Sequence, residues 1–102
     1  MKNNAKEYYF VMEETKQREL LMEVSELRLG DSRVSVVKRL GAPTYDRADV
    51  TKEGRALGRS VVYYLKIWEK GLVNEKHDKF VRLEFDTSDR LVKITQKIED
   101  LH

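Results

Sequence analysis

The second half of the chain contains three stretches in which apolar and polar residues alternate. Their apolar members are Val61, Tyr63, Leu65 and Ile67, then Val81, Leu83 and Phe85, then Val92, Ile94 and Ile98. Side chains of a strand point to its two faces in turn, so each stretch predicts a β-strand with one apolar face. The connecting segments, GLVNEKHD and TSDR, are too short for the crossovers that parallel strands need. The pattern therefore predicts a three-stranded antiparallel sheet that must bury one face against a second layer.

Helical spacing in the first half predicts part of that second layer. Apolar residues recur at helical intervals at Leu20, Leu21, Val24 and Leu27. They stand among Glu, Lys, Arg and Gln, which are good helix formers. This spacing predicts a helix over about residues 15–26.

A second, shorter helix is expected directly after the first. Ser32 can cap its first turn by accepting a hydrogen bond from a free backbone N–H, and Asp31 is a competing cap. Gly41 followed by Pro43 is typical of a helix end, since glycine adopts the left-handed conformation and proline cannot continue a helix. The predicted fold class is α+β: two N-terminal helices packed on one face of a three-stranded antiparallel sheet, a two-layer ααβββ arrangement.

Three other regions are expected to lie outside these elements. Residues 44–60 mix charges with two glycines and show no sustained period, so they predict a long loop. Residues 1–19 are mostly polar and are expected to form an N-terminal tether or partner-binding segment. The domain itself would cover residues 20–98, with residues 99–102 as a C-terminal tail.

Length and composition exclude several classes of protein. The chain has 102 residues and a net charge of +2, which suits one domain without a basic field. Acidic residues are interspersed with the basic ones, so no nucleic-acid partner is expected. The chain has no cysteine, and no run of about 18 apolar residues that could cross a membrane.

The sequence offers no convergent set of catalytic or metal-binding groups. His77 lies near Glu75 and Asp78, but neighbours in a loop converge poorly, and the solvated-loop interpretation is favoured. Glu23 and Glu26 are expected on a helix surface, where they would pair with Lys or Arg. The chain is therefore predicted to be no enzyme, with no cofactor and no metal.

The sheet face that points away from the helices is the candidate binding site. If the alternation continues along the strands, this partner-binding face carries Tyr64, Lys66, Trp68, Arg82 and Lys93. Large aromatic and Arg side chains are common anchors of protein interfaces, and two exposed aromatics are more than solubility requires. The alternative is that the YYFVM block or the long loop folds over these rings and makes them part of the core.

A longer motif carries a family resemblance. Residues 27–43, LRLGDSRVSVVKRLGAP, hold in fixed order Gly30, Ser32, Val36, Leu40, Gly41 and Pro43. This segment resembles the Gly-x-Ser/Thr-x-x-x-Val-x-x-x-Leu-Gly-x-Pro signature of the SmpA/OmlA family of bacterial outer-membrane lipoproteins, which has the BamE-like fold. Residues 81–94, VRLEFDTSDRLVKI, are similar to the second hairpin of that family.

The resemblance implies a cell-envelope function. It implies a non-enzymatic protein-interaction module at the periplasmic face of the outer membrane, held there by a lipid anchor outside this chain. Its partners would be outer-membrane barrel proteins or their assembly factors. The fold is also similar to the repeats of a secreted β-lactamase inhibitor protein, so the alternative is a periplasmic or secreted inhibitor that docks its sheet face on an enzyme. The oligomeric state stays open.

Overall fold

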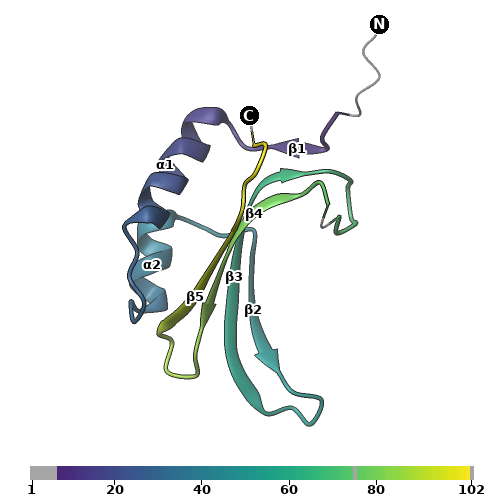
Figure 1. Ribbon diagram of the computed structural model, residues 1–102. Helices are drawn as coiled ribbons and strands as arrows, with labels where there is room; N and C mark the ends of the chain where they lie inside the picture. The colour runs from purple at the N-terminus through teal and green to yellow at the C-terminus, as the bar shows by residue number, and fades with distance from the viewer. Residues whose placement is uncertain (1–6, 75, 102) are drawn as a thin grey trace, which may run out of the picture.

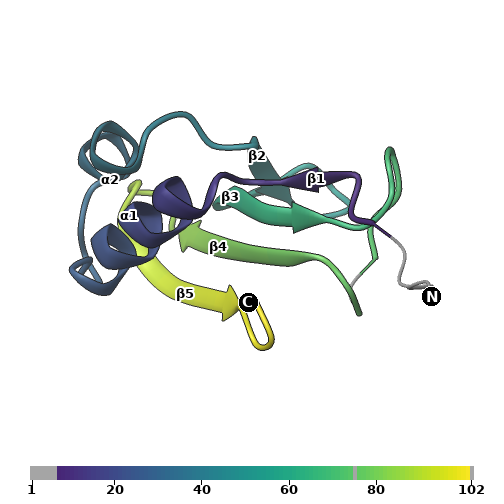
Figure 2. The ribbon, with the colours of Figure 1, turned by 90° about the horizontal axis from the view of Figure 1, so that it is seen from above.

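The computed structural model describes residues 7–74 and 76–101, which form two helices and a five-stranded antiparallel sheet. The elements in chain order are β1 (Phe10–Val11), α1 (Glu14–Ser25), α2 (Arg33–Leu40), β2 (Tyr45–Val50), β3 (Ala56–Ile67), β4 (Lys79–Phe85) and β5 (Leu91–Lys97). Both helices lie on the same side of the sheet (Figures 1 and 2). Neither described helix is long and apolar enough to span a membrane. The α+β class is confirmed.

The prediction of three strands is wrong, because two further strands pair with β3. β4 lies along one edge of β3 and is followed by β5, whereas β1 and β2 both pair with the opposite edge of β3. β2 and β3 form a hairpin from Tyr45 opposite Val62 to Val50 opposite Ala56, so the loop expected over residues 44–60 is mostly strand. An edge strand with both faces largely exposed needs no apolar periodicity, because backbone pairing alone can place it.

The N-terminal part of the chain belongs to the sheet from Phe10 onwards, and Tyr8 just before it already contacts Trp68. β1 pairs Phe10 with Ile67 and Val11 with Lys66. α1 begins at Glu14, and its buried Gln17 donates a hydrogen bond to the backbone oxygen of Met12 at 2.8 Å. Residues 10–19 thus add a short strand and the first turns of α1, and a role for residues 1–19 in binding stays a prediction.

The ends of α2 confirm the two capping predictions. The Ser32 hydroxyl accepts a hydrogen bond from the backbone N–H of Ser35 at 3.2 Å. Asp31 does not cap α2; its carboxylate accepts from the backbone N–H of Arg28 at 2.9 Å. Gly41 ends the helix with φ of +91°, a conformation that favours glycine.

The hydrophobic core lies between the helices and the sheet. Its buried apolar residues are Leu20, Val24, Leu27, Val36, Val61, Tyr63, Leu65, Val81, Leu83, Phe85, Leu91 and Leu101. Leu101 belongs to the C-terminal tail, and the Lys66 ammonium donates a hydrogen bond to its backbone oxygen. Because both helices cover the same face, the opposite face of the sheet is left for other contacts.

Candidate functional site

The opposite face of the sheet, called here the outer face, contains a hollow of about 300 Å³. Its lining comes from β2, β3, β4 and the connection between β3 and β4. The residues of this outer-face hollow are Tyr45, Arg47, Val62, Tyr64, Val73, Phe80 and Arg82. It therefore combines aromatic and aliphatic surface with two arginine side chains.

Three rings cross the outer-face hollow in edge-to-face contact, and we call Tyr45, Tyr64 and Phe80 the aromatic row. The centroids of Tyr45 and Tyr64 are 5.9 Å apart with planes at 81°, and those of Tyr64 and Phe80 are 5.7 Å apart at 60°. The Arg82 guanidinium lies 5.6 Å from the centroid of Phe80. Such contacts hold the rings in place, so the row presents a preordered apolar surface.

Charged groups lie at the margin of the aromatic row. Arg82 is 3.9 Å from Glu84, and Arg47 is 3.7 Å from Asp49. Burial, together with the nearby carboxylate of Asp78, raises the pKa of Tyr64, so its hydroxyl stays a neutral hydrogen-bond donor in ordinary buffers. An apolar centre with a charged margin is the usual composition of a protein interface.

Three of the five predicted site residues come together on the outer face. Tyr64 and Arg82 line the outer-face hollow. Lys93 lies on β5 opposite Glu84, and it shares with Arg82 a neighbouring hollow of about 480 Å³. The structure therefore places Tyr64, Arg82 and Lys93 as the alternation predicts.

Lys66 and Trp68 do not share this face, because the register of β3 shifts after Tyr64. Tyr64 is opposite Phe80, but Lys66 is opposite Lys79, so β3 has one extra residue there. Lys79 has the same orientation as the buried Val81, two positions along β4. The bulge therefore turns Lys66 towards the helix side of the sheet, and Trp68, two residues later, follows it.

Trp68 lies in a small cluster of its own at the end of β3. Its ring makes an edge-to-face contact with Tyr8, centroid to centroid 4.9 Å, and stacks on His77 at 4.2 Å. Tyr8 belongs to the YYFVM block, whose folding over the aromatic rings was the alternative to an exposed tryptophan. His77 is half-buried by this stacking rather than solvated, and Glu75 lies outside the described residues.

Two residues that complete the aromatic row, Tyr45 and Phe80, are not among the predicted site residues. Phe80 has the same parity as Arg82 and Glu84, so the alternation of β4 could have placed it on the outer face. Tyr45 gave no such signal, because it lies in a segment interpreted as a loop. Only the pairing of β2 with β3 brings it beside Tyr64.

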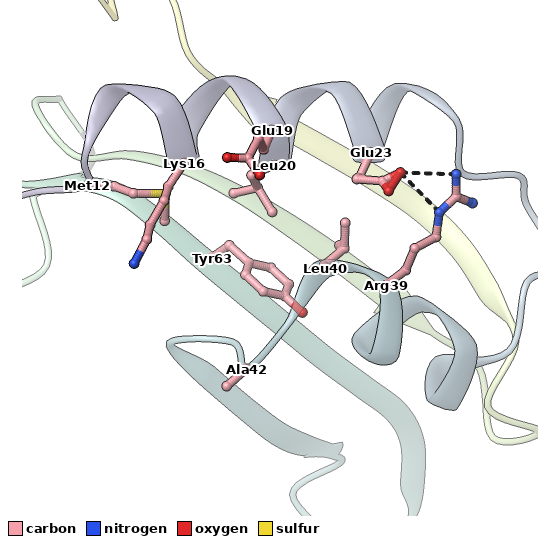
Figure 3. Close-up of a pocket in the computed structure, with 9 residues that line it drawn as sticks. All are labelled: Met12, Lys16, Glu19, Leu20, Glu23, Arg39, Leu40, Ala42 and Tyr63. Atoms are coloured by element: carbon pink, nitrogen blue, oxygen red, sulfur yellow. Dashed lines mark hydrogen bonds and ion pairs between the residues drawn. The ribbon is translucent and has the colours of Figure 1, made fainter.

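Another hollow, of about 430 Å³, lies on the helix side, between α1, α2 and β3. Figure 3 shows its lining residues, Met12, Lys16, Glu19, Leu20, Glu23, Arg39, Leu40, Ala42 and Tyr63. Arg39 bridges the helices by ion pairs to Glu23 at 3.2 Å and Glu26 at 2.6 Å. The Tyr63 hydroxyl donates to the backbone oxygen of Gly41 at 2.7 Å and so ties β3 to the end of α2.

Replacing Tyr63 with phenylalanine is expected to have a pH-dependent effect on stability. Burial, with a smaller contribution from the charge of Asp46, raises the pKa of Tyr63 to about 12. Near neutral pH the loss of the hydroxyl should lower the free energy of unfolding by about 1 kcal/mol. As pH rises through about 10, Tyr63 ionises in the unfolded chain but keeps its proton in the folded one, which favours the unfolded state of the wild type. The variant has no hydroxyl at this position, so it does not lose this stability.

Urea denaturation at neutral pH and near pH 11 measures this difference. The gap between wild type and Tyr63→Phe should close to about zero at the higher pH. A gap of the same size at both values would contradict the raised pKa.

The fold and the outer face define a class of protein: a two-layer α+β domain with one sheet face covered by helices and one carrying an aromatic row. Comparison with protein-family models, curated proteins and solved structures finds no match for this chain. The resemblance to the SmpA/OmlA family therefore stays a prediction.

Proposed function

We propose that this chain is a non-enzymatic protein-interaction module that binds its partner through the outer face of the sheet. The observation that supports this most is the aromatic row, Tyr45, Tyr64 and Phe80, with Arg82 against its end. Tyr45 is 58% exposed, although a ring of this size is usually covered. Tyrosine and arginine are, with tryptophan, the residues enriched among interface anchors.

The cell-envelope part of the proposal rests on the resemblance of residues 27–43 and 81–94 to the SmpA/OmlA family. On that basis the module acts at the periplasmic face of the outer membrane, and a lipid anchor outside this chain holds it there. Its partners are then barrel proteins of the outer membrane or their assembly factors.

Capture from a bacterial envelope extract, followed by binding measurements on the captured protein, tests both parts. Tyr64→Ala and Arg82→Glu should each raise the dissociation constant about 30-fold, the loss expected for an interface anchor. Met22→Ala is the control, because Met22 is 65% exposed on α1, on the other side of the sheet.

Each outcome decides one part of the proposal. Unchanged binding by both outer-face variants would show that the partner does not use this face. A captured soluble hydrolase, in place of a barrel protein or an assembly factor, would replace the assembly function by that of an enzyme inhibitor.

A further inference from the structure

The outer edge of β2 is a row of backbone groups that no described strand pairs. Among the described strands β2 pairs only with β3, and Figure 1 shows it at the margin of the sheet, away from both helices. Its six residues, YDRADV, are exposed or half-buried, including Tyr45 at 58% and Val50 at 56%. An edge of this length is a template for another strand.

The charged side chains of β2 differ in how closely they are paired within the same chain. Asp46 lies on the helix side of the strand, where Arg59 is 2.8 Å away and Arg33 is 3.5 Å away. Asp49 accepts a hydrogen bond from the Ser60 hydroxyl at 2.7 Å. The Arg47 side chain is 76% exposed and reaches Asp49 only at 3.7 Å. Arg47 is thus the charge on this edge with most to gain from a second carboxylate.

A second copy of β2 supplies that carboxylate in one antiparallel register. When both helix layers stay on one side of a continuous sheet, odd-numbered residues of β2 face odd-numbered residues of the second copy. A two-fold axis at Arg47 sets two guanidinium groups against each other, and an axis at Asp49 sets two carboxylates against each other. A two-fold axis at Ala48 places the small alanine side chains at the centre of the pair. Arg47 of each copy then lies opposite Asp49 of the other copy, so two ion pairs can form.

We infer that two copies of this chain associate through their β2 edges, antiparallel and centred on Ala48, into one continuous sheet. The charges on this edge discourage pairing with other strands and in other registers, and they favour this one. The association places both outer faces on the same side, so the two aromatic rows face the same way. It stands independently of the partner proposed above.

Charge exchange tests the association in solution by analytical ultracentrifugation over a wide concentration range. The wild type should show a concentration-dependent dimer. Arg47→Asp places carboxylates against carboxylates and should raise the dimer dissociation constant about tenfold or more. The double variant Arg47→Asp with Asp49→Arg reverses both charges and should restore the dimer.

Arg18→Asp is the matched control, because Arg18 is 70% exposed on α1 and the change in charge is the same. It should dimerise like the wild type. A wild type that stays monomeric at every concentration, or an Arg47→Asp variant that dimerises as well as the wild type, overturns the inference.

Cysteine trapping locates the axis, and the chain has no native cysteine to interfere. Residues directly opposite in an antiparallel pair have Cα atoms about 4.5 to 5.5 Å apart, which suits a disulfide. Ala48→Cys should therefore form a disulfide-linked dimer under mild oxidation. Val92→Cys, also on an exposed strand position but in β5, is the control and should not. Equal cross-linking of both variants would overturn the register.

Discussion

Gly58→Ala is expected to lower the free energy of unfolding by about 3 kcal/mol or more. Gly58 has φ of +130°, which side chains rarely adopt. A β-carbon built there would lie 2.0 Å from the backbone oxygen of Phe85 on the neighbouring strand. Backbone cannot move aside as a side-chain end can, so β3 and β4 would have to separate where Arg59 pairs with Phe85.

Gly54→Ala is the matched control for this prediction. Gly54 also has a positive φ, +87°, but a β-carbon there would meet nothing within 4 Å. Only the conformational cost applies, about 1 kcal/mol. Urea denaturation of both variants separates the two effects, and equal losses would show that the close approach to Phe85 does not limit the fold.

Asp78→Ala is expected to lower the free energy of unfolding by about 3 kcal/mol. Asp78 is 1% exposed, and its carboxylate accepts from the backbone N–H groups of Trp68 and Asn74, both at 2.8 Å. These bonds tie the end of β3 to the connection before β4. Alanine would remove the buried carboxylate that accepts both hydrogen bonds.

Asp78→Asn keeps the shape and one acceptor oxygen, so it should lose about half as much. Trp68 fluorescence reports the same site, since its stacking on His77 depends on the connection that Asp78 holds. Its emission should shift to longer wavelength in Asp78→Ala under native conditions. A variant with wild-type stability and emission would show that the two hydrogen bonds contribute little.

Local sequence patterns were sufficient for the elements that carry the core. The alternation around Leu65 and Leu83 predicts β3 and β4, because one face of each is more deeply buried than the other. β5 is also predicted as a strand, but Leu91 is its buried residue, and Val92, expected on the apolar face, is 50% exposed because the register shifts between Lys93 and Leu91. Ser32 and Gly41 predict both ends of α2, because capping depends on residues within one helical turn. Residues that are close in the sequence are enough to specify strand alternation and helix caps.

The candidate site was predictable in part, up to the point where the alternation of β3 breaks. Tyr64 and Arg82 lie on the outer face as parity requires. The extra residue after Tyr64 reverses the orientation of Lys66 and Trp68, and a bulge is visible only in the pairing of two strands. Phe80 also lies on the outer face, as the parity of β4 requires.

The edge formed by β1 and β2, and the meeting of the three rings of the aromatic row, were decided by tertiary structure alone. β2 has no apolar face to bury, so its sequence, YDRADV, does not predict a strand. Its strand conformation depends on pairing with β3. β1 is two residues long and exists only as a partner of β3. The row joins Tyr45, Tyr64 and Phe80 from three strands. Periodicity specifies which side of a strand faces the core, whereas long-range pairing specifies which strands lie side by side and therefore which side chains meet.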